Sequence, residues 1–251
     1  MTGERLPSFF RLERFAQLAS TNGEATRLAA AGAREGTLVV AEEQSAGRGR
    51  RGRTWVSPPG NLYGSLVLRP PRPAHEAAQL GFAASLAVLE SCRHFLPAGT
   101  ALACKWPNDV LAGGRKLAGI LLESRAAGAG ALDWLVIGIG VNLASYPRDT
   151  EFPATSLAEA GAPGVTPDTM LTILAARILA WYEAWQRPGG FAALRAQWLA
   201  HAQGLGGPIR VRLADRELDG RFAGLDDGGR LLLDGAEGRQ AIAAAEIFPA
   251  A

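Results

Sequence analysis

Four arginines and three glycines are interleaved in one short stretch, AEEQSAGRGRRGRTW, at residues 41–55. They are Arg48, Arg50, Arg51, Arg53, Gly47, Gly49 and Gly52. Because like charges repel and glycine loses much backbone entropy on folding, we predict a mobile loop, not a helix or strand. Ordering about seven residues costs roughly 1 to 2 kcal/mol each, and each charge-assisted hydrogen bond to phosphate or carboxylate returns roughly 1.5 to 3 kcal/mol. We therefore expect the loop to become ordered when it binds an anion, above all a phosphate.

Three interpretations of this basic loop compete. It is a solvated turn, a nucleic-acid-binding tract of the RGG kind, or a phosphate or acyl-phosphate clamp inside an enzyme. Basic nucleic-acid arms usually lie at chain termini or in long polar tails. This loop instead follows one apolar stretch with strand character, residues 36–41, and precedes another, residues 61–68. A charged loop held between two strands favours a binding or catalytic site.

The two lysines of the chain, Lys105 and Lys116, lie in one short segment, although the sequence has 26 basic residues. Their retention among so many arginines suggests that a compact ammonium group is needed there. Residues 102–106 alternate in a way that predicts a strand with Lys105 projecting from one face. Pro107 ends that strand, and Gly113-Gly114 is predicted to turn the chain into a second strand that begins near Lys116.

The overall composition narrows the function classes. The chain has 251 residues, 48% of them hydrophobic, and its 26 basic residues nearly balance 24 acidic ones, so bulk attraction to polyanions is excluded. Cys92 and Cys104 lack metal or redox spacing and are interpreted as small core residues, with no zinc site. We find no apolar run of signal-peptide or membrane-spanning length, and expect a cytoplasmic protein.

The elements around these residues follow from periodicity and turn signals. A capping-box spacing from Thr21 to Glu24 predicts a helix that ends at Gly32. Further helices are predicted at residues 75–95, 168–186 and 191–203, and a further strand at residues 134–143. The glycine-rich segment at residues 204–208 is predicted to be a linker, followed by a small antiparallel barrel of short strands. We therefore divide the chain into domains at residues 1–205 and 206–251.

Taken together, the motifs resemble those of biotin protein ligases. They are STN at residues 20–22, QSAGRGRRGRTW from Gln44, NLYGSLVL, KWPND at residues 105–109, RKLAGILLE at residues 115–123 and GIGVN at residues 138–142. The resemblance implies an α+β fold, in which a mixed sheet flanked by helices, of the class II synthetase-like type, carries an SH3-like C-terminal barrel. It also implies a reaction in two steps. The biotin carboxylate attacks ATP, with Mg²⁺, to give biotinyl-5'-AMP, and a lysine of a biotin carboxyl carrier protein domain then displaces AMP.

The same resemblance implies roles for individual residues. Biotin would be bound by Ser20, Thr21, Asn22, Gln44, Gly47, Arg48, Lys116 and Gly119. ATP and the adenylate would be bound by Arg50, Arg51, Arg53, Trp55, Asn108, Lys116 and Asn142. Arg50, Lys116, Lys105 and Asp109 would lie at the reacting centre, Asp109 as a hypothetical base or metal contact. No fixed protein metal site is expected, because Mg²⁺ would enter with ATP. The resemblance leaves open a homodimer formed through the catalytic sheet.

Two departures and two rivals accompany this interpretation. STN begins at residue 20, which leaves no room for an N-terminal DNA-binding domain, so we expect a monofunctional ligase that binds neither DNA nor membranes. Gly23 stands where an acidic or other polar residue would be expected. A lipoate or octanoate ligase would share the fold but lacks this basic glycine loop. A non-catalytic nucleic-acid module would leave KWPND and Lys116 without a role.

Overall fold

The structure is a computed structural model, and it describes residues 6–128 and 131–249. Seven strands form the larger sheet: β1 (Arg11–Leu18), β2 (Thr37–Gln44), β3 (Leu62–Leu68), β4 (Leu102–Lys105), β5 (Asp109–Ala112), β6 (Arg115–Gly128) and β7 (Ala131–Val141). Their order is β1-β2-β3-β7-β6-β5-β4. Strands β1 and β2 are parallel and the other pairs are antiparallel. The predicted mixed sheet is therefore confirmed.

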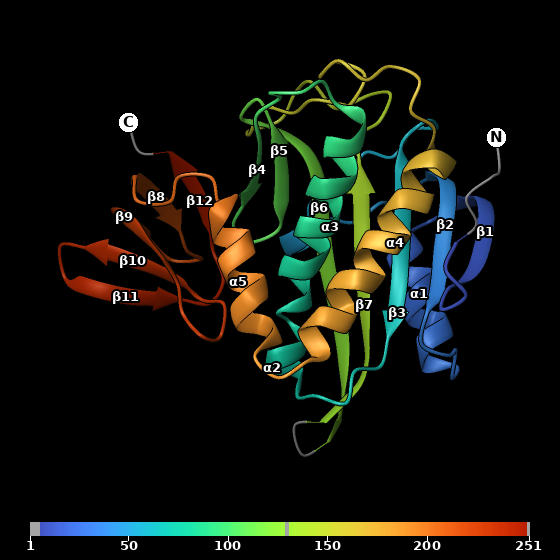
Figure 1. Ribbon diagram of the computed structural model, residues 1–251, viewed down its shortest axis with the longest axis horizontal. Coiled ribbons are helices and arrows are strands. Elements are labelled where there is room, and N and C mark those ends of the chain that lie inside the picture. The colour runs from blue at the N-terminus through green and yellow to red at the C-terminus, as the bar shows by residue number, and fades with distance from the viewer. Residues whose placement is uncertain (1–5, 129–130, 250–251) are drawn as a thin grey trace.

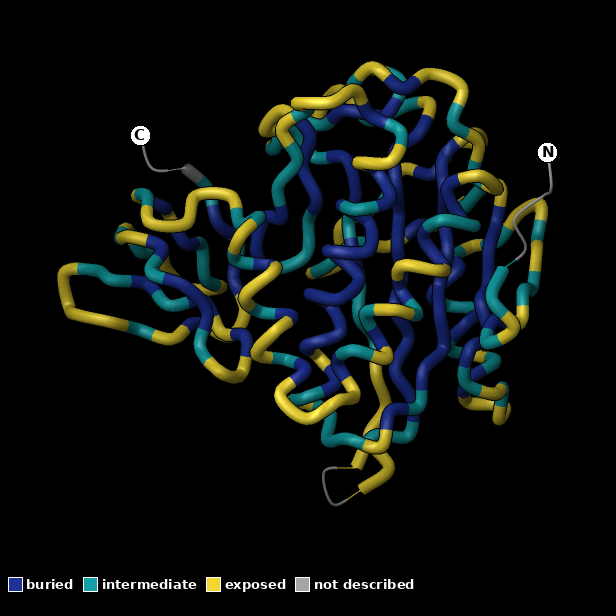
Figure 2. Tube along the Cα trace, viewed as in Figure 1, coloured by how far each residue is buried: buried dark blue, intermediate teal, exposed yellow. Residues whose placement is uncertain are grey.

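Helices pack on both faces of this sheet. They are α1 (Thr21–Ala30), α2 (Ala74–Ala77), α3 (Leu80–Phe95), α4 (Pro167–Gln186) and α5 (Gly190–Ala200). Because side chains alternate along a strand, Val39 and Val67 face α1, whereas Leu38 and Leu66 face the core beneath α3 and α4. Figure 1 shows α3 and α4 lying across one face of the sheet, and Figure 2 shows that α3 is buried along most of its length.

A second, smaller sheet follows the glycine-rich segment after α5. It contains β8 (Pro208–Arg212), β9 (Glu217–Leu225), β10 (Leu231–Gly235), β11 (Gly238–Ile242) and β12 (Glu246–Pro249), in the order β11-β10-β9-β8-β12. All its pairs are antiparallel, as predicted for an SH3-like domain, and β11 and β12 are the two edges of the hydrogen-bonded order in the described part. The boundary near residue 205 stays a prediction.

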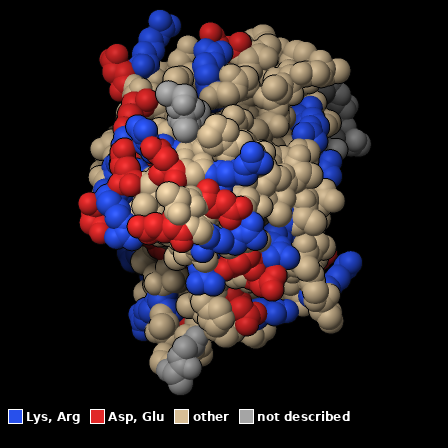
Figure 3. Space-filling model, turned by 90° about the vertical axis from the view of Figure 1, so that its left-hand side faces the viewer, with Lys and Arg blue, Asp and Glu red and all other residues tan. Residues whose placement is uncertain are grey.

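The face formed by the smaller sheet carries both signs of charge. Figure 3 shows basic and acidic side chains interspersed over it. Many are paired, such as Arg210 with Asp219 at 2.8 Å and Arg239 with Asp234 at 2.7 Å. Such a face does not offer the continuous positive surface that a nucleic acid binds.

Three local features differ from the predictions. Strand β1 was not predicted, because its exposed edge position leaves it without an alternating apolar pattern. The helix predicted at residues 75–95 is divided into α2 and α3, with Gln79 between them buried against Trp185 through a 2.9 Å hydrogen bond. Strand β6, predicted to begin near Lys116, runs to Gly128, beyond the RKLAGILLE motif of residues 115–123. The two cysteines are buried core residues, as predicted. The described helices include none with the length and apolar character to span a membrane.

Candidate functional site

One cavity of about 450 Å³ collects most of the residues singled out in the sequence. It is lined by the start of α1, the basic loop, the strands β6 and β7, the loop at residues 147–154 and strand β12 of the smaller sheet. Of the predicted site residues, those that line it are Ser20, Thr21, Asn22, Gln44, Arg48, Arg50, Arg53, Trp55, Lys105, Asn108, Asp109, Lys116, Gly119 and Asn142. Gly47 and Arg51 belong to the same loop but do not line the cavity.

The basic loop has more local structure than predicted. Its main chain closes as a small hairpin, since Gly49 N–H donates to the Arg53 carbonyl at 2.7 Å and Trp55 N–H donates to the Gly47 carbonyl at 2.9 Å. A short 3-10 turn spans Arg50–Gly52, with Arg51 at a positive φ of 55°. A Cβ on Gly47 would lie 2.3 Å from the Trp55 carbonyl oxygen, so glycine is needed there for the hairpin to close. Residues 45–55 thus lie outside the strands and α-helices, as predicted, but are held by local hydrogen bonds; the predicted mobility stays a prediction.

The arginines that line the cavity have different partners. Arg48 pairs with Glu123 of β6 at 3.0 Å. Arg53 pairs with Glu246 of β12 through two contacts of 2.8 Å. Arg50 instead donates to the neutral side-chain oxygen of Asn108 at 3.3 Å. Burial, together with the repulsion of neighbouring Arg51, lowers the pKa of Arg50 from its usual value. Arg50 is thus the one arginine lining the cavity that pairs with no carboxylate of the described residues.

A continuous hydrogen-bond network organises the start of α1. The Ser65 hydroxyl is 2.6 Å from Asn22 Oδ1, which can only accept, and Ser65 Oγ lies 2.8 Å from Thr21 Oγ1. Gln44 Oε1 accepts from both the backbone N–H and the hydroxyl of Thr21, at 2.8 and 3.1 Å. Ser20 is the N-cap of the helix and accepts from Gly23 N–H at 3.4 Å. This end of the cavity is therefore rich in neutral polar groups held in fixed orientations.

Trp55 forms one wall of the cavity. Its indole lies against Gly119 and Gly140, where an added Cβ would come within 3.0 and 2.5 Å of the ring. Lys116 Nζ lies 5.4 Å from the centre of the same ring. Glycine at both strand positions is what allows the indole to lie flat against the sheet. The two glycines thus permit a close approach of the Trp55 side chain to β6 and β7.

Lys116 is held at the centre of the cavity. Its backbone is fixed on the side facing the loop at residues 147–154, since Lys116 N–H donates to the Pro153 carbonyl at 2.7 Å and the Lys116 carbonyl accepts from Thr155 N–H at 2.9 Å. Its Nζ lies 2.7 Å from Asp109 Oδ1. Two of the residues assigned to the reacting centre are thus in direct contact. Asn142 also lines the cavity, but its side-chain nitrogen already donates to the Thr155 carbonyl at 3.0 Å.

Lys105 projects from the end of β4 into a nearly enclosed aromatic environment. Its Nζ lies 3.6 Å from the centre of the Phe152 ring and 5.2 Å from that of Phe248. The residue is only 7% exposed. Removal from water, opposed by the nearby Asp109 carboxylate, lowers the pKa of Lys105 to about 8. The phenyl rings favour the charged form but replace the lost water only partly.

Replacement of Lys105 by methionine is expected to stabilise the fold at pH 7. Between pH about 8 and the ordinary lysine value of 10.5, the unfolded chain binds more protons than the native protein, so wild-type stability rises with pH across that window. The variant lacks this dependence. Its melting temperature should be about 3 °C above that of the wild type at pH 7, because a gain of roughly 1 kcal/mol in the free energy of unfolding shifts the melting temperature by that much in a chain of this size. The difference should shrink as the pH rises toward 10.5. Thermal unfolding at several pH values checks this, and a constant difference would contradict it.

Several residues that line the cavity, or that contact residues lining it, carry no signal that sequence reasoning used. Glu123 ends the motif RKLAGILLE, and Ser65 lies inside NLYGSLVL, so both were near recognised motifs. Phe152, Glu246 and Phe248 come from distant segments, and their alternating or loop patterns give no local sign that they meet Lys105 and Arg53. Among the described residues, no group of three or more His, Cys, Asp or Glu side chains is arranged to hold a metal ion.

Comparisons with known proteins agree with this geometry. The chain matches the biotin/lipoate A/B protein ligase family over residues 15–142 and the biotin protein ligase C terminal domain over residues 204–248. It is 46% identical to the biotin–[acetyl-CoA-carboxylase] ligase of Paracoccus denitrificans, over 91% of this chain and 96% of that protein. It is 38% identical to the bifunctional ligase/repressor BirA of Bacillus subtilis, over 92% of this chain and 71% of that protein.

A solved structure gives the same result for the fold. The biotin protein ligase of Aquifex aeolicus in complex with biotin and ATP superposes with a TM-score of 0.79 at 28% identity, over 95% of this chain and 97% of that one. The helix-flanked mixed sheet and the small C-terminal antiparallel sheet are thus shared with an enzyme of known architecture. The chain therefore belongs to the biotin/lipoate A/B protein ligase family and, within it, to the biotin protein ligases.

Proposed function

We propose that this protein activates biotin with ATP to give biotinyl-5'-AMP and pyrophosphate, and then transfers the biotinyl group to an acceptor lysine of a biotin carboxyl carrier protein domain. The observation that carries the proposal is the division of the cavity. Fixed neutral polar groups surround the start of α1, and Arg50, Lys105 and Lys116 lie in the same space of about 450 Å³. A molecule with an uncharged polar ring and a carboxylate to be joined to a phosphate fits this arrangement.

The neutral end of the cavity would bind the ureido ring of biotin. Thr21 and Gln44 hold each other in place, and Asn22 is fixed by Ser65, so these groups are oriented before the ligand arrives. Ser20 would complete this end, and Gly119, beside Trp55 and Lys116, would border the rest of the biotin molecule. Preorganised hydrogen-bond partners bind a polar ligand at lower entropic cost than mobile ones.

The cationic end would bind the carboxylate and the triphosphate. Attack of a carboxylate on the α-phosphorus gathers negative charge, which fixed cations stabilise more strongly in the transition state than in the bound substrates. Lys116 and Arg50 are the cations that we assign to this task, with Asn108 orienting Arg50. Mg²⁺ would enter as part of the MgATP substrate and would neutralise part of the phosphate charge. Trp55 and Asn142 would form the nucleotide side.

In the second step an amine must lose a proton before it attacks the adenylate. Asp109 lies beside Lys116 at 2.7 Å and is mostly shielded from solvent, so we assign it to receive that proton once the ligands have drawn Lys116 away. The acceptor lysine would enter at the mouth between the basic loop and β12. A closed loop would also protect the adenylate from water.

Pyrophosphate exchange into ATP tests the proposed function. Purified protein with MgATP should support exchange when biotin is the acid, and not with lipoate or octanoate. In Arg50→Ala, exchange should fall about 100-fold, the size of effect that removal of one preorganised charged donor gives. Exchange with lipoate or octanoate would assign the protein to the other branch of the family. Absence of exchange with every acid, in a folded sample, would overturn the proposal.

A further inference from the structure

The basic loop is attached at both ends to carboxylates from different parts of the fold. Arg48, before the 3-10 turn, pairs with Glu123 of β6, and Arg53, after it, pairs with Glu246 of β12. Arg50 lies between them, and no carboxylate of the described residues pairs with it; its side-chain partner is the Asn108 amide. The positive charges of Arg48 and Arg53 are thus paired with carboxylates, and the positive charge of Arg50 between them is not.

The pair formed by Arg53 and Glu246 has the stronger geometry. Nη1 of Arg53 contacts Oε1 of Glu246 and Nη2 contacts Oε2, both at 2.8 Å, in the bidentate arrangement that makes arginine pairs strong. The Glu246 side chain is only 15% exposed, and Arg53 is 56% exposed at the cavity mouth. These two residues are separated by 193 positions in the chain. The contact therefore joins the loop to the smaller sheet.

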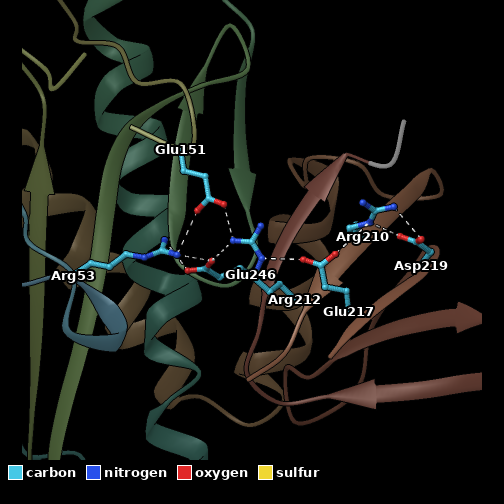
Figure 4. Close-up of polar contacts among 7 residues, drawn as sticks. All are labelled: Arg53, Glu151, Arg210, Arg212, Glu217, Asp219 and Glu246. Carbon is cyan, nitrogen blue, oxygen red and sulfur yellow. Dashed lines mark hydrogen bonds and ion pairs between the residues drawn. The ribbon is translucent and has the colours of Figure 1, made fainter. Parts of the chain in front are cut away.

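Glu246 belongs to a cluster of ion pairs that also includes residues from three other segments. Figure 4 shows Arg53, Glu151 and Arg212 gathered around it. Arg212, which faces Glu246 across the β8–β12 pair, lies 4.0 Å from it and 2.6 Å from Glu151. Glu151 lies 3.6 Å from Arg53. Alternation along β12 places Phe248 on the same side as Glu246, where it contacts Lys105 and Arg212.

The pair formed by Arg48 and Glu123 is tied to the other end of the cavity. Glu123 also accepts from the side-chain nitrogen of Asn22 at 2.8 Å. Arg48 passes close to the start of α1 on its way to Glu123, since a Cβ added at Gly23 would lie 3.9 Å from its guanidinium, an ordinary van der Waals distance.

From this geometry we infer that Glu123 and Glu246 are positioning residues that hold the basic loop closed over the cavity, so that Arg50 is presented to the substrate phosphates. The inference rests on the proposed function and deepens it. It also gives the smaller sheet a part in the reaction, since Glu246 supplies one of the two attachments. Neither glutamate needs to touch the substrate: each acts through the arginine that it fixes.

A double-mutant cycle on the Arg53–Glu246 pair tests the inference with the full-length protein. Glu246→Gln and Arg53→Gln should each raise the KM for ATP about fivefold in biotin-dependent pyrophosphate exchange, with kcat changed much less, and the double variant should be no worse than the more severe single one. Glu123→Gln, which keeps an acceptor for Asn22, should raise the KM for biotin similarly. Independent, multiplying effects of Arg53→Gln and Glu246→Gln would overturn the inference.

A second readout needs no enzymatic activity. Trypsin should cleave after Arg50 or Arg51 about fivefold faster in ligand-free Glu246→Gln than in the wild type, because an attached loop must open before it is cut. Since Glu151 could replace the lost partner of Arg53, the double variant Glu151→Gln/Glu246→Gln is included. The matched control is Arg239→Gln, which breaks a bidentate pair with Asp234 on the far edge of the smaller sheet.

The outcomes separate the inference from the function on which it rests. Faster cleavage and a raised KM, both absent in Arg239→Gln, support the inference. Unchanged cleavage and unchanged KM in the double glutamate variant overturn it while wild-type exchange with biotin still supports the function. If the glutamate variants are cleaved faster but the wild type shows no pyrophosphate exchange, the two ion pairs do hold the loop and the proposed function is overturned.

Discussion

Replacement of Lys116 by alanine is expected to lower biotin-dependent pyrophosphate exchange by about 10³-fold. Lys116 is fixed by backbone hydrogen bonds to Pro153 and Thr155, and its ammonium lies at the centre of the cavity beside Asp109. The variant would lose the cation placed where the carboxylate and the phosphate meet, and it would leave Asp109 to repel both anions. Initial exchange rates at saturating biotin and ATP measure the effect.

Lys116→Arg serves as the matched control for this prediction. Arginine keeps the charge but presents it as a planar fork on a longer side chain, so its donors would not occupy the position from which Lys116 Nζ contacts Asp109 at 2.7 Å. We expect only partial recovery, with exchange still at least tenfold below the wild type. Full activity in Lys116→Arg would show that charge alone suffices, and wild-type exchange in Lys116→Ala would remove Lys116 from the mechanism.

Asp109→Asn separates the two steps of the proposed reaction. If Asp109 receives the proton of the acceptor amine, transfer from preformed biotinyl-5'-AMP to a carrier domain should fall much more than exchange does. A smaller loss of exchange is expected in addition, because the asparagine no longer holds the Lys116 ammonium by charge. If neither step changes, the assigned role of Asp109 is wrong.

The basic loop and the lysine-bearing strand could be predicted because their signals are local. Arginine among glycines, two lysines in one segment, and the proline that ends β4 are each visible within a few residues. What could not be predicted is which distant segments would meet them. Phe248 and Glu246 alternate along a short edge strand, a pattern that equally suits an ordinary exposed edge. Their contacts with Lys105 and Arg53 depend on how the smaller sheet packs on the larger one.

Local structure in the loop was also beyond the sequence argument. We predicted a mobile loop from the repulsion among its four arginines. That argument took no account of charged partners outside the loop. The fold instead supplies carboxylates from β6 and β12, so the electrostatic cost falls and the hairpin hydrogen bonds of Gly49 and Trp55 can form. The compensating groups lie 75 and 193 positions away from the arginines that they contact. Charge repulsion within a segment is therefore a poor guide to order when the partners are distant.

Substitution of Gly138 by alanine should abolish most biotin binding through a single methyl group. Gly138 lies on β7 beneath the start of α1, and an added Cβ would be 2.0 Å from Asn22 Oδ1. The strand is hydrogen-bonded on both sides, to β3 and β6, so the backbone cannot move aside. Asn22 must therefore leave its position and break its hydrogen bonds to Ser65 and Glu123, at 2.6 and 2.8 Å.

The expected loss in biotin affinity is about 100-fold. Buried polar groups left without partners cost roughly 1 to 3 kcal/mol, and about 2.7 kcal/mol corresponds to a 100-fold change in Kd. Gly64→Ala on neighbouring β3 is the matched control, because its added Cβ would meet nothing closer than 3.9 Å, beside a small apolar cavity of about 20 Å³. Isothermal titration with biotin and thermal unfolding of both variants, together with Asn22→Ala/Gly138→Ala, provide the comparison. The double variant removes the clash, so its thermal stability should return. Its biotin affinity should stay low, because Asn22 orients the neutral end of the cavity. If Gly138→Ala binds biotin as tightly as the wild type, biotin binding does not depend on that hydrogen-bond network.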